Sequence, residues 1–188
     1  MPRILGERVM LREYREEDFS AIRAWVNDPE TTKYLSGRFL MPHTALQTEQ
    51  YMQEILSGKA SGYRFVIALR ADGAYLGQAD FFYVDPVSRC TEMGIVLGSE
   101  AARGRGYGRE ALGLLLKFGF ESLNLHRVWL DVYAENARAI RCYEACGFQK
   151  EGVLRAQEFS RGAYHDIVRM GLLQEEWAAH AKQGAFIR

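Results

Sequence analysis

The chain has few cysteines, few prolines and no long apolar run. Three cysteines cannot all pair with one another, and the N-terminal stretch MPRILGERVMLREYREED lacks the apolar segment of a secretion signal. We therefore expect reduced thiols and a cytoplasmic protein. A transmembrane helix needs about eighteen or more consecutive apolar residues, and because no such stretch is present we predict none.

Charge of one sign is not in excess either. The 24 basic residues balance the 24 acidic ones, which argues against a nucleic-acid or membrane-binding protein. Cys142 and Cys146 lie four residues apart, but His126 and His165 are far from them in the sequence, so we predict buried thiols and no metal site. The length of 188 residues, 48% of them hydrophobic, predicts one domain over 1–188, with a core from about 8 to 175 and a C-terminal tail.

The spacing of apolar residues predicts an α/β fold with a mixed sheet, in the order β-α-α-β-β-β-α-β-α-β-β. Hairpins come early and late, and strand–helix–strand units lie between them. The expected helices are 16–30, 44–58, 110–123 and 136–147, and the expected strands are 9–13, 63–70, 74–85, 89–98, 126–133, 148–159 and 164–173.

The segment ARGRGYGRE, residues 102–110, follows a predicted strand and opens a predicted helix. Glycines let a backbone approach a ligand closely, and a helix start offers unpaired N–H groups and partial positive charge, so this pattern favours an anion site. A P-loop would need Lys-Ser or Lys-Thr, and a dinucleotide fingerprint would need a third glycine; both are missing. The other interpretation is a glycine-rich turn among solvated arginines.

Two segments together point to a family. Arg103, Gly106 and Gly108 form Arg-x-x-Gly-x-Gly, which resembles motif A of the Gcn5-related N-acetyltransferases, whose loop holds the pyrophosphate of acetyl-coenzyme A. NARAIRCYEACGF, residues 136–148, is similar to the family pattern Asn-x-x-Ala-Ile-x-x-Tyr-x-x-x-Gly-Phe. LNLHRVWLDV, FQKEGV and GAYHDIVRM are similar to segments in the branch that holds Rim-type and bacterial spermidine acetyltransferases.

The resemblance implies direct acetyl transfer from acetyl-coenzyme A to a primary amine within a ternary complex. Tyr143 occupies the position of the family's general acid. A thiol titrates near about 8.5 and a tyrosine near about 10, so the tyrosine is still protonated when it meets a departing thiolate. Glu92, on the strand before the loop, is the candidate base. The alternative interpretation of Tyr143 is a tyrosine that packs in the core, and that of Glu92 is an exposed glutamate on a strand. A chain of water molecules could also act as the base in place of Glu92.

The resemblance also implies which residues bind the cofactor. Asn136 would hydrogen-bond the pantetheine arm, although its position is also typical of an ordinary helix N-cap. The full expected set is Ile95, Val96, Leu97, Arg103, Gly104, Arg105, Gly106, Tyr107, Gly108, Arg109, Asn136 and Ala139.

The acceptor stays open between a protein N-terminus, a polyamine, another small amine and an aminoglycoside-like antibiotic. A noncatalytic acyl-coenzyme A-binding module on the same fold is the competing class. No dense acidic cluster marks a polyamine site. Because many relatives in the family are homodimers, we also expect a homodimer. The residues considered for the acceptor side are the acidic Asp28, Glu30, Asp80 and Asp85 and the aromatic Tyr34, Phe39, Phe81, Tyr83 and Tyr164.

Overall fold

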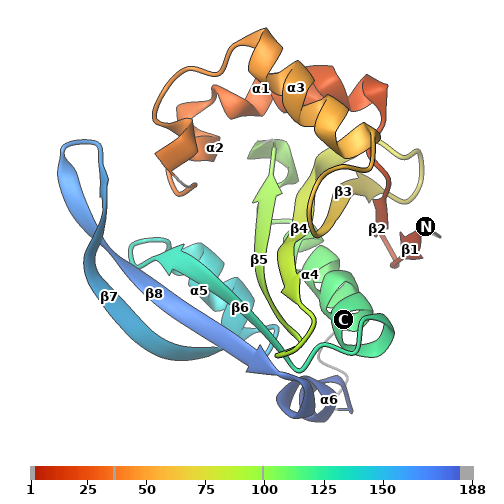
Figure 1. The fold of residues 1–188 in the computed structure, drawn as a ribbon, viewed down its shortest axis with the longest axis vertical. Coiled ribbons are helices and arrows are strands. Elements are labelled where there is room, and N and C mark those ends of the chain that lie inside the picture. Colours follow the sequence, from red (N-terminus) through yellow and green to blue (C-terminus); the bar gives the residue numbers. More distant parts are fainter. Residues whose placement is uncertain (1–2, 36, 99, 183–188) are drawn as a thin grey trace.

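The computed structural model describes residues 3–35, 37–98 and 100–182. Within them, one sheet has eight strands in the order β1-β2-β3-β4-β5-β6-β8-β7 (Figure 1). All neighbouring strands are antiparallel except β5 and β6, which are parallel. The mixed α/β fold expected from the sequence is confirmed. The strands are Ile4–Leu5 (β1), Val9–Arg12 (β2), Tyr63–Leu69 (β3), Tyr75–Asp85 (β4), Cys90–Leu97 (β5), Arg127–Tyr133 (β6), Gln149–Ser160 (β7) and Ala163–Leu173 (β8).

Helices cover both faces of the sheet. The first three pack on one face, where Ile22, Trp25 and Met52 form a core with Met10 and Val66 of the sheet. The next two pack on the other face, over a larger core. The helices are Phe19–Val26 (α1), Pro29–Thr32 (α2), Ala45–Leu56 (α3), Tyr107–Lys117 (α4), Ala137–Glu144 (α5) and Gln174–Lys182 (α6). In the described part of the chain, no helix is long and apolar enough to cross a membrane.

The alternation of side chains along β6 explains the two faces. Val128, Leu130 and Val132 are buried against α4 and α5, while Trp129 and Asp131 point to the opposite face. Burying the apolar face of each element against its neighbour is the main stabilising term of such a layered fold.

Helix boundaries differ from the sequence expectation at two places. Asp28 and Pro29 do not only end a helix: Asp28 caps α2 by accepting from the N–H groups of Glu30 and Thr31, and Pro29 takes its first position. Helix α4 begins at Tyr107, three residues before the expected start, and continues into a π-helical turn at Phe118–Ser122.

The C-terminal segment was expected to be a tail after about residue 175. Instead, residues 174–182 form α6, which packs under the sheet. The Trp177 ring stacks on Phe120 with 5.3 Å between centroids, and His180 bonds the carbonyl of Ala145 at 3.2 Å. The sequence analysis did not predict this helix, because α6 has little amphipathic pattern of its own and is held by these long-range contacts.

Candidate active site

The two parallel strands at the centre of the sheet separate soon after they meet. Strands β5 and β6 pair at only three positions, from Cys90 with Arg127 to Glu92 with Trp129. From residue 93 to 97, β5 stays paired with β4 but has no strand partner on its other edge among the described residues. Figure 1 shows the two strands diverging from their lower ends. Apart from the Leu97 carbonyl oxygen, which accepts from Arg103 at 3.4 Å, the backbone donors and acceptors on this edge are therefore open to a ligand.

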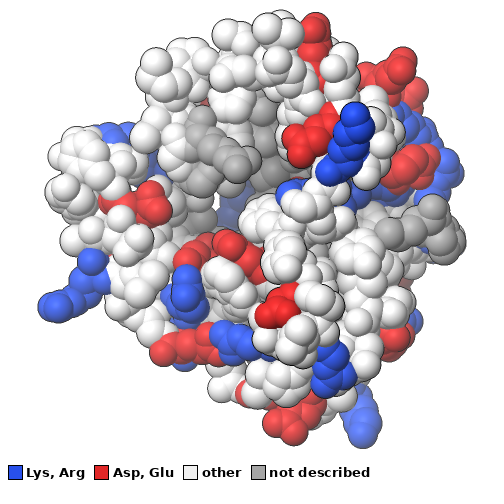
Figure 2. All heavy atoms as spheres, in the orientation of Figure 1, with Lys and Arg blue, Asp and Glu red and all other residues white. Residues whose placement is uncertain are grey.

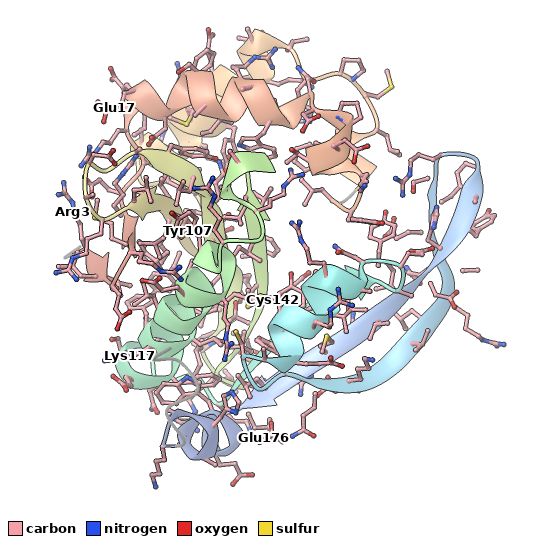
Figure 3. The ribbon with its side chains drawn as sticks, turned by 180° about the vertical axis from the view of Figure 1, so that it is seen from behind. Arg3, Glu17, Tyr107, Lys117, Cys142 and Glu176 are labelled. Carbon is pink, nitrogen blue, oxygen red and sulfur yellow. The ribbon has the colours of Figure 1, made fainter. Side chains whose placement is uncertain are left out.

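The glycine-rich loop ends at the start of α4, which lies beside α5 on one face of the sheet (Figure 3). Gly104 and Gly106 have positive φ angles of 76° and 82°, and Gly106 is the N-cap of α4. Among the described residues, no acceptor is found for the N–H groups of Tyr107 and Gly108. Two free donors at the positive end of a helix form a site for an anion.

The three loop arginines differ in their surroundings. Arg105 and Arg109 are exposed beside the helix start. The Arg103 guanidinium instead turns towards α2, where it donates to the Thr31 hydroxyl and to the Leu97 carbonyl oxygen, the latter at 3.4 Å. Arg103 thus joins the end of β5 to α2.

A further loop contact was missed by sequence reasoning. Arg8, 97 residues away in the chain, donates to the carbonyl of Arg105 at 2.9 Å and lies 5.3 Å from the centroid of the Tyr107 ring. It also pairs with Glu110 of α4 at 3.0 Å. An acidic residue in the first turn of α4 was the one signal in the sequence, and nothing indicated its partner.

Asn136 caps α5. Its side-chain oxygen accepts from the N–H of Ala139 at 3.2 Å, as the capping interpretation requires. The side-chain NH2 group makes no hydrogen bond within the described residues, so it can donate to a ligand. The two roles considered for Asn136 are therefore compatible, because they use different atoms.

Tyr143 lies on α5, on the same face as α4. Its ring packs on the core and contacts Phe148 edge-on, with 5.9 Å between centroids. Burial raises the pKa of Tyr143 above its usual value, with the neighbouring Cys142 and Cys146 thiols adding to the rise. The hydroxyl has no hydrogen-bond partner among the described residues. A protonated phenol that lacks a partner is suited to donate a proton.

Glu92 faces the opposite side of the sheet. Its neighbour Thr91 points into the core beneath α4, and the alternation of the strand turns Glu92 to the face of Trp129 and Asp131. Burial raises the pKa of Glu92, the Asp131 carboxylate raises it further, and Arg169 opposes both. Arg169 is paired with Asp131 at 2.8 Å. Glu92 is thus a half-buried carboxylate at the point where β5 leaves β6.

The acidic residues considered for the acceptor side all have partners. Asp28 caps α2, Glu30 pairs with Lys33 at 2.8 Å, and Asp80 pairs with Arg64 at 3.3 Å. Asp85 accepts from the N–H of Val87 at 2.8 Å in a tight turn. On the described surface, these four carboxylates do not form an unpaired cluster that would attract a polycation.

The aromatic candidates divide into core, groove and surface. Phe81 is fully buried in the core, so it is not available to an acceptor. Tyr34 and Phe39 lie near a groove of about 400 Å³ between α2, residues 37–42 and the β7–β8 hairpin, which Phe39 lines. Tyr83 and Tyr164 are largely exposed. In Figure 2 the surface is hollowed between the α1–α3 helices and the β6–β8 part of the sheet.

Comparison with known proteins agrees with this architecture. The model of the acetyltransferase (GNAT) domain matches residues 8–149. The chain belongs to the GNAT acetyltransferase family. It is 33% identical to the uncharacterized N-acetyltransferase p20 of Bacillus licheniformis, over 95% of this chain and 99% of that protein.

Two further GNAT relatives carry a named substrate. The chain is 29% identical to a spermidine N(1)-acetyltransferase of Escherichia coli, over 93% of this chain and 90% of that protein. The crystal structure of spermidine N-acetyltransferase from Vibrio cholerae in complex with CoA and spermine superposes with a TM-score of 0.81 at 27% identity, covering 92% of this chain and 99% of that one. This GNAT chain is therefore an N-acetyltransferase.

Proposed function

We propose that the protein transfers the acetyl group of acetyl-coenzyme A directly to a primary amine. The observation that carries the proposal is the separation of β5 from β6 just beyond Glu92. It places an open strand edge between the Tyr143 face and the Glu92 face. The start of α4, with its free N–H groups, follows at the far end of β5.

The residues present fit acetyl-coenzyme A. The N–H groups of Tyr107 and Gly108 and the exposed Arg105 and Arg109 side chains would hold its phosphates. The open edge of Ile95, Val96 and Leu97, with the NH2 group of Asn136, would hold the pantetheine arm. The N–H of Ala139 donates to the side-chain oxygen of Asn136 and so leaves the NH2 group of Asn136 for the ligand. When bound, the thioester supplies an activated acetyl group.

Each catalytic residue has one task in this mechanism. Glu92 accepts a proton from the acceptor amine, directly or through a water molecule, and so makes the amine nucleophilic. A backbone N–H of the open β5 edge polarises the thioester carbonyl. Tyr143 donates its proton to the departing thiolate sulfur. We further propose that the enzyme is a cytoplasmic homodimer, which light scattering and cell fractionation would test.

Substitution of the proposed acid tests this mechanism. Tyr143→Phe keeps the ring that packs on Phe148 and removes only the hydroxyl, so we expect a similar melting temperature and an unchanged KM for acetyl-coenzyme A. The kcat for acetyl transfer should fall at least tenfold, because general acid catalysis contributes at least about that factor. Release of free thiol with a panel of amines measures it. An unchanged kcat would remove Tyr143 from the mechanism.

A further inference from the structure

The groove beside α2 is mainly apolar. Its lining includes Val26, Leu35 and Phe39 from the α1–α3 side and Tyr133 and Phe159 from the sheet. Its volume of about 400 Å³ lies in the range of small-molecule and peptide side-chain sites. Such a lining favours an acceptor with an apolar body and offers little to a polyamine, which carries several separated charges.

The charges in the groove are on balance positive. Its one lining carboxylate, Glu30, is neutralised by Lys33 at 2.8 Å. Arg161 also lines the groove and has no carboxylate within ion-pair distance among the described residues. The nearby Glu135 is bound to His165 at 2.7 Å. Figure 2 shows basic atoms between the hairpin tip and the helices.

Arg161 occupies a backbone position that disfavours it. Ser160 pairs with Ala163, so Arg161 and Gly162 form a two-residue hairpin turn with φ angles of 52° and 80°. Asparagine, aspartate and glycine are the usual residues at the first central position of such a turn, and other side chains pay about 1–2 kcal/mol there. A strained arginine at the rim of a groove suggests that its side chain is used. The guanidinium lies over the Tyr34 ring, 5.7 Å from its centroid.

The groove and Glu92 share one face of the sheet. Tyr133 lines the groove, and Trp129, four residues earlier on the same face of β6, is in register with Glu92. Four residues of strand span about 13 Å. An acceptor that reaches from Glu92 to the groove is therefore about four extended residues long.

The chemistry of the amine agrees with this length. A peptide α-amine loses its proton near about 7.7–8.0, whereas an alkyl amine such as that of lysine loses it near about 10.4. A carboxylate base deprotonates the first far more readily at neutral pH.

We propose that the acceptor is the α-amine of a short apolar peptide, and that Arg161 binds a carboxylate about four residues from that amine. This inference rests on the proposed function and adds the substrate class. Arg161 is the specificity-determining residue: it selects for the anionic end of the acceptor and against polyamines.

The test uses a four-residue apolar peptide with a free C-terminal carboxylate and the same peptide with a C-terminal amide. With the full-length enzyme we expect the carboxylate peptide to have a kcat/KM at least tenfold above that of the amide and of spermidine. A series from one to six residues should peak near four.

Arg161→Asn is the decisive variant, because asparagine suits the turn and the protein should fold at least as well. We expect the KM for the carboxylate peptide to rise about tenfold, with kcat within twofold and no change for the amide. Arg155→Asn, at an exposed position of the same hairpin outside the groove, is the matched control and should change neither value.

The outcomes separate the two proposals. Equal use of both peptides, or no effect of Arg161→Asn, overturns the anion site. Turnover of spermidine without turnover of any peptide overturns the substrate class and leaves the transferase mechanism standing. Release of thiol with none of the amines, although acetyl-coenzyme A binds, overturns the proposed function itself.

Discussion

Two glycines of the loop at the start of α4 should respond in opposite ways to alanine. Gly106 has a φ of 82°, and an added Cβ would lie 3.0 Å from an Nη atom of Arg8. Gly108 is inside the first turn of α4, and an added Cβ would meet only Leu97, at 3.6 Å. The first site is strained for alanine, and the second is not.

The expected magnitudes follow from these geometries. A left-handed residue costs about 1–2 kcal/mol, so Gly106→Ala should lower the melting temperature by about 2–8 °C in a chain of this size. Gly108→Ala replaces glycine in a helix and should gain up to about 1 kcal/mol, or a rise of up to about 4 °C. Thermal unfolding without ligand measures both.

Binding should not follow stability. If the phosphates of acetyl-coenzyme A contact the free N–H groups at the start of α4, a methyl group on Gly108 obstructs them. We expect Gly108→Ala to raise the KM for acetyl-coenzyme A at least tenfold while the melting temperature rises. Initial rates at varied acetyl-coenzyme A measure this. A stabilised Gly108→Ala enzyme with an unchanged KM would refute the phosphate site, and an unchanged melting temperature in Gly106→Ala would refute the left-handed turn.

The remaining predictions concern two carboxylates. Because burial raises the pKa of Glu92, the rate of acetyl transfer should fall as the pH drops through that raised pKa. Glu92→Gln should lower kcat/KM about a hundredfold and abolish this fall at acidic pH. A fall at acidic pH that persists in the variant would assign the base to another group. Burial also raises the pKa of Asp80 from 3.8 to about 6, against the opposing effect of Arg64. The stability that Asp80 contributes is therefore complete below pH 3.8 and lost as the pH rises through about 6. Asp80→Asn should be more stable than the parent by up to about 3 kcal/mol at pH 8 and equal to it near pH 3, and a difference in urea unfolding that does not change with pH would contradict this.

Local patterns identified most of the elements correctly. Strands with alternating apolar residues, such as β6, and helices with a clear N-cap, such as those after Thr44 and Asn136, were found close to their observed bounds. Their signals are contained in a few neighbouring residues. Elements with weak patterns were missed: β1 has two residues, α2 has four, and α6 is helical through its contacts with Phe120 and Ala145.

The same division holds for the candidate site. The sequence alone determined the glycines of the turn before α4, the cap at Asn136 and the tyrosine two helical turns beyond it, because backbone conformation and helical spacing are local properties. Only the tertiary structure decided which atoms are open: that Arg103 turns to α2, that Arg8 supports the loop, and that Asp80 and Phe81 are buried. It also placed Arg161 and Lys33, 128 positions apart in the chain, around one groove. Such contacts depend on how the sheet brings distant segments together, and residue spacing along the chain carries no record of them.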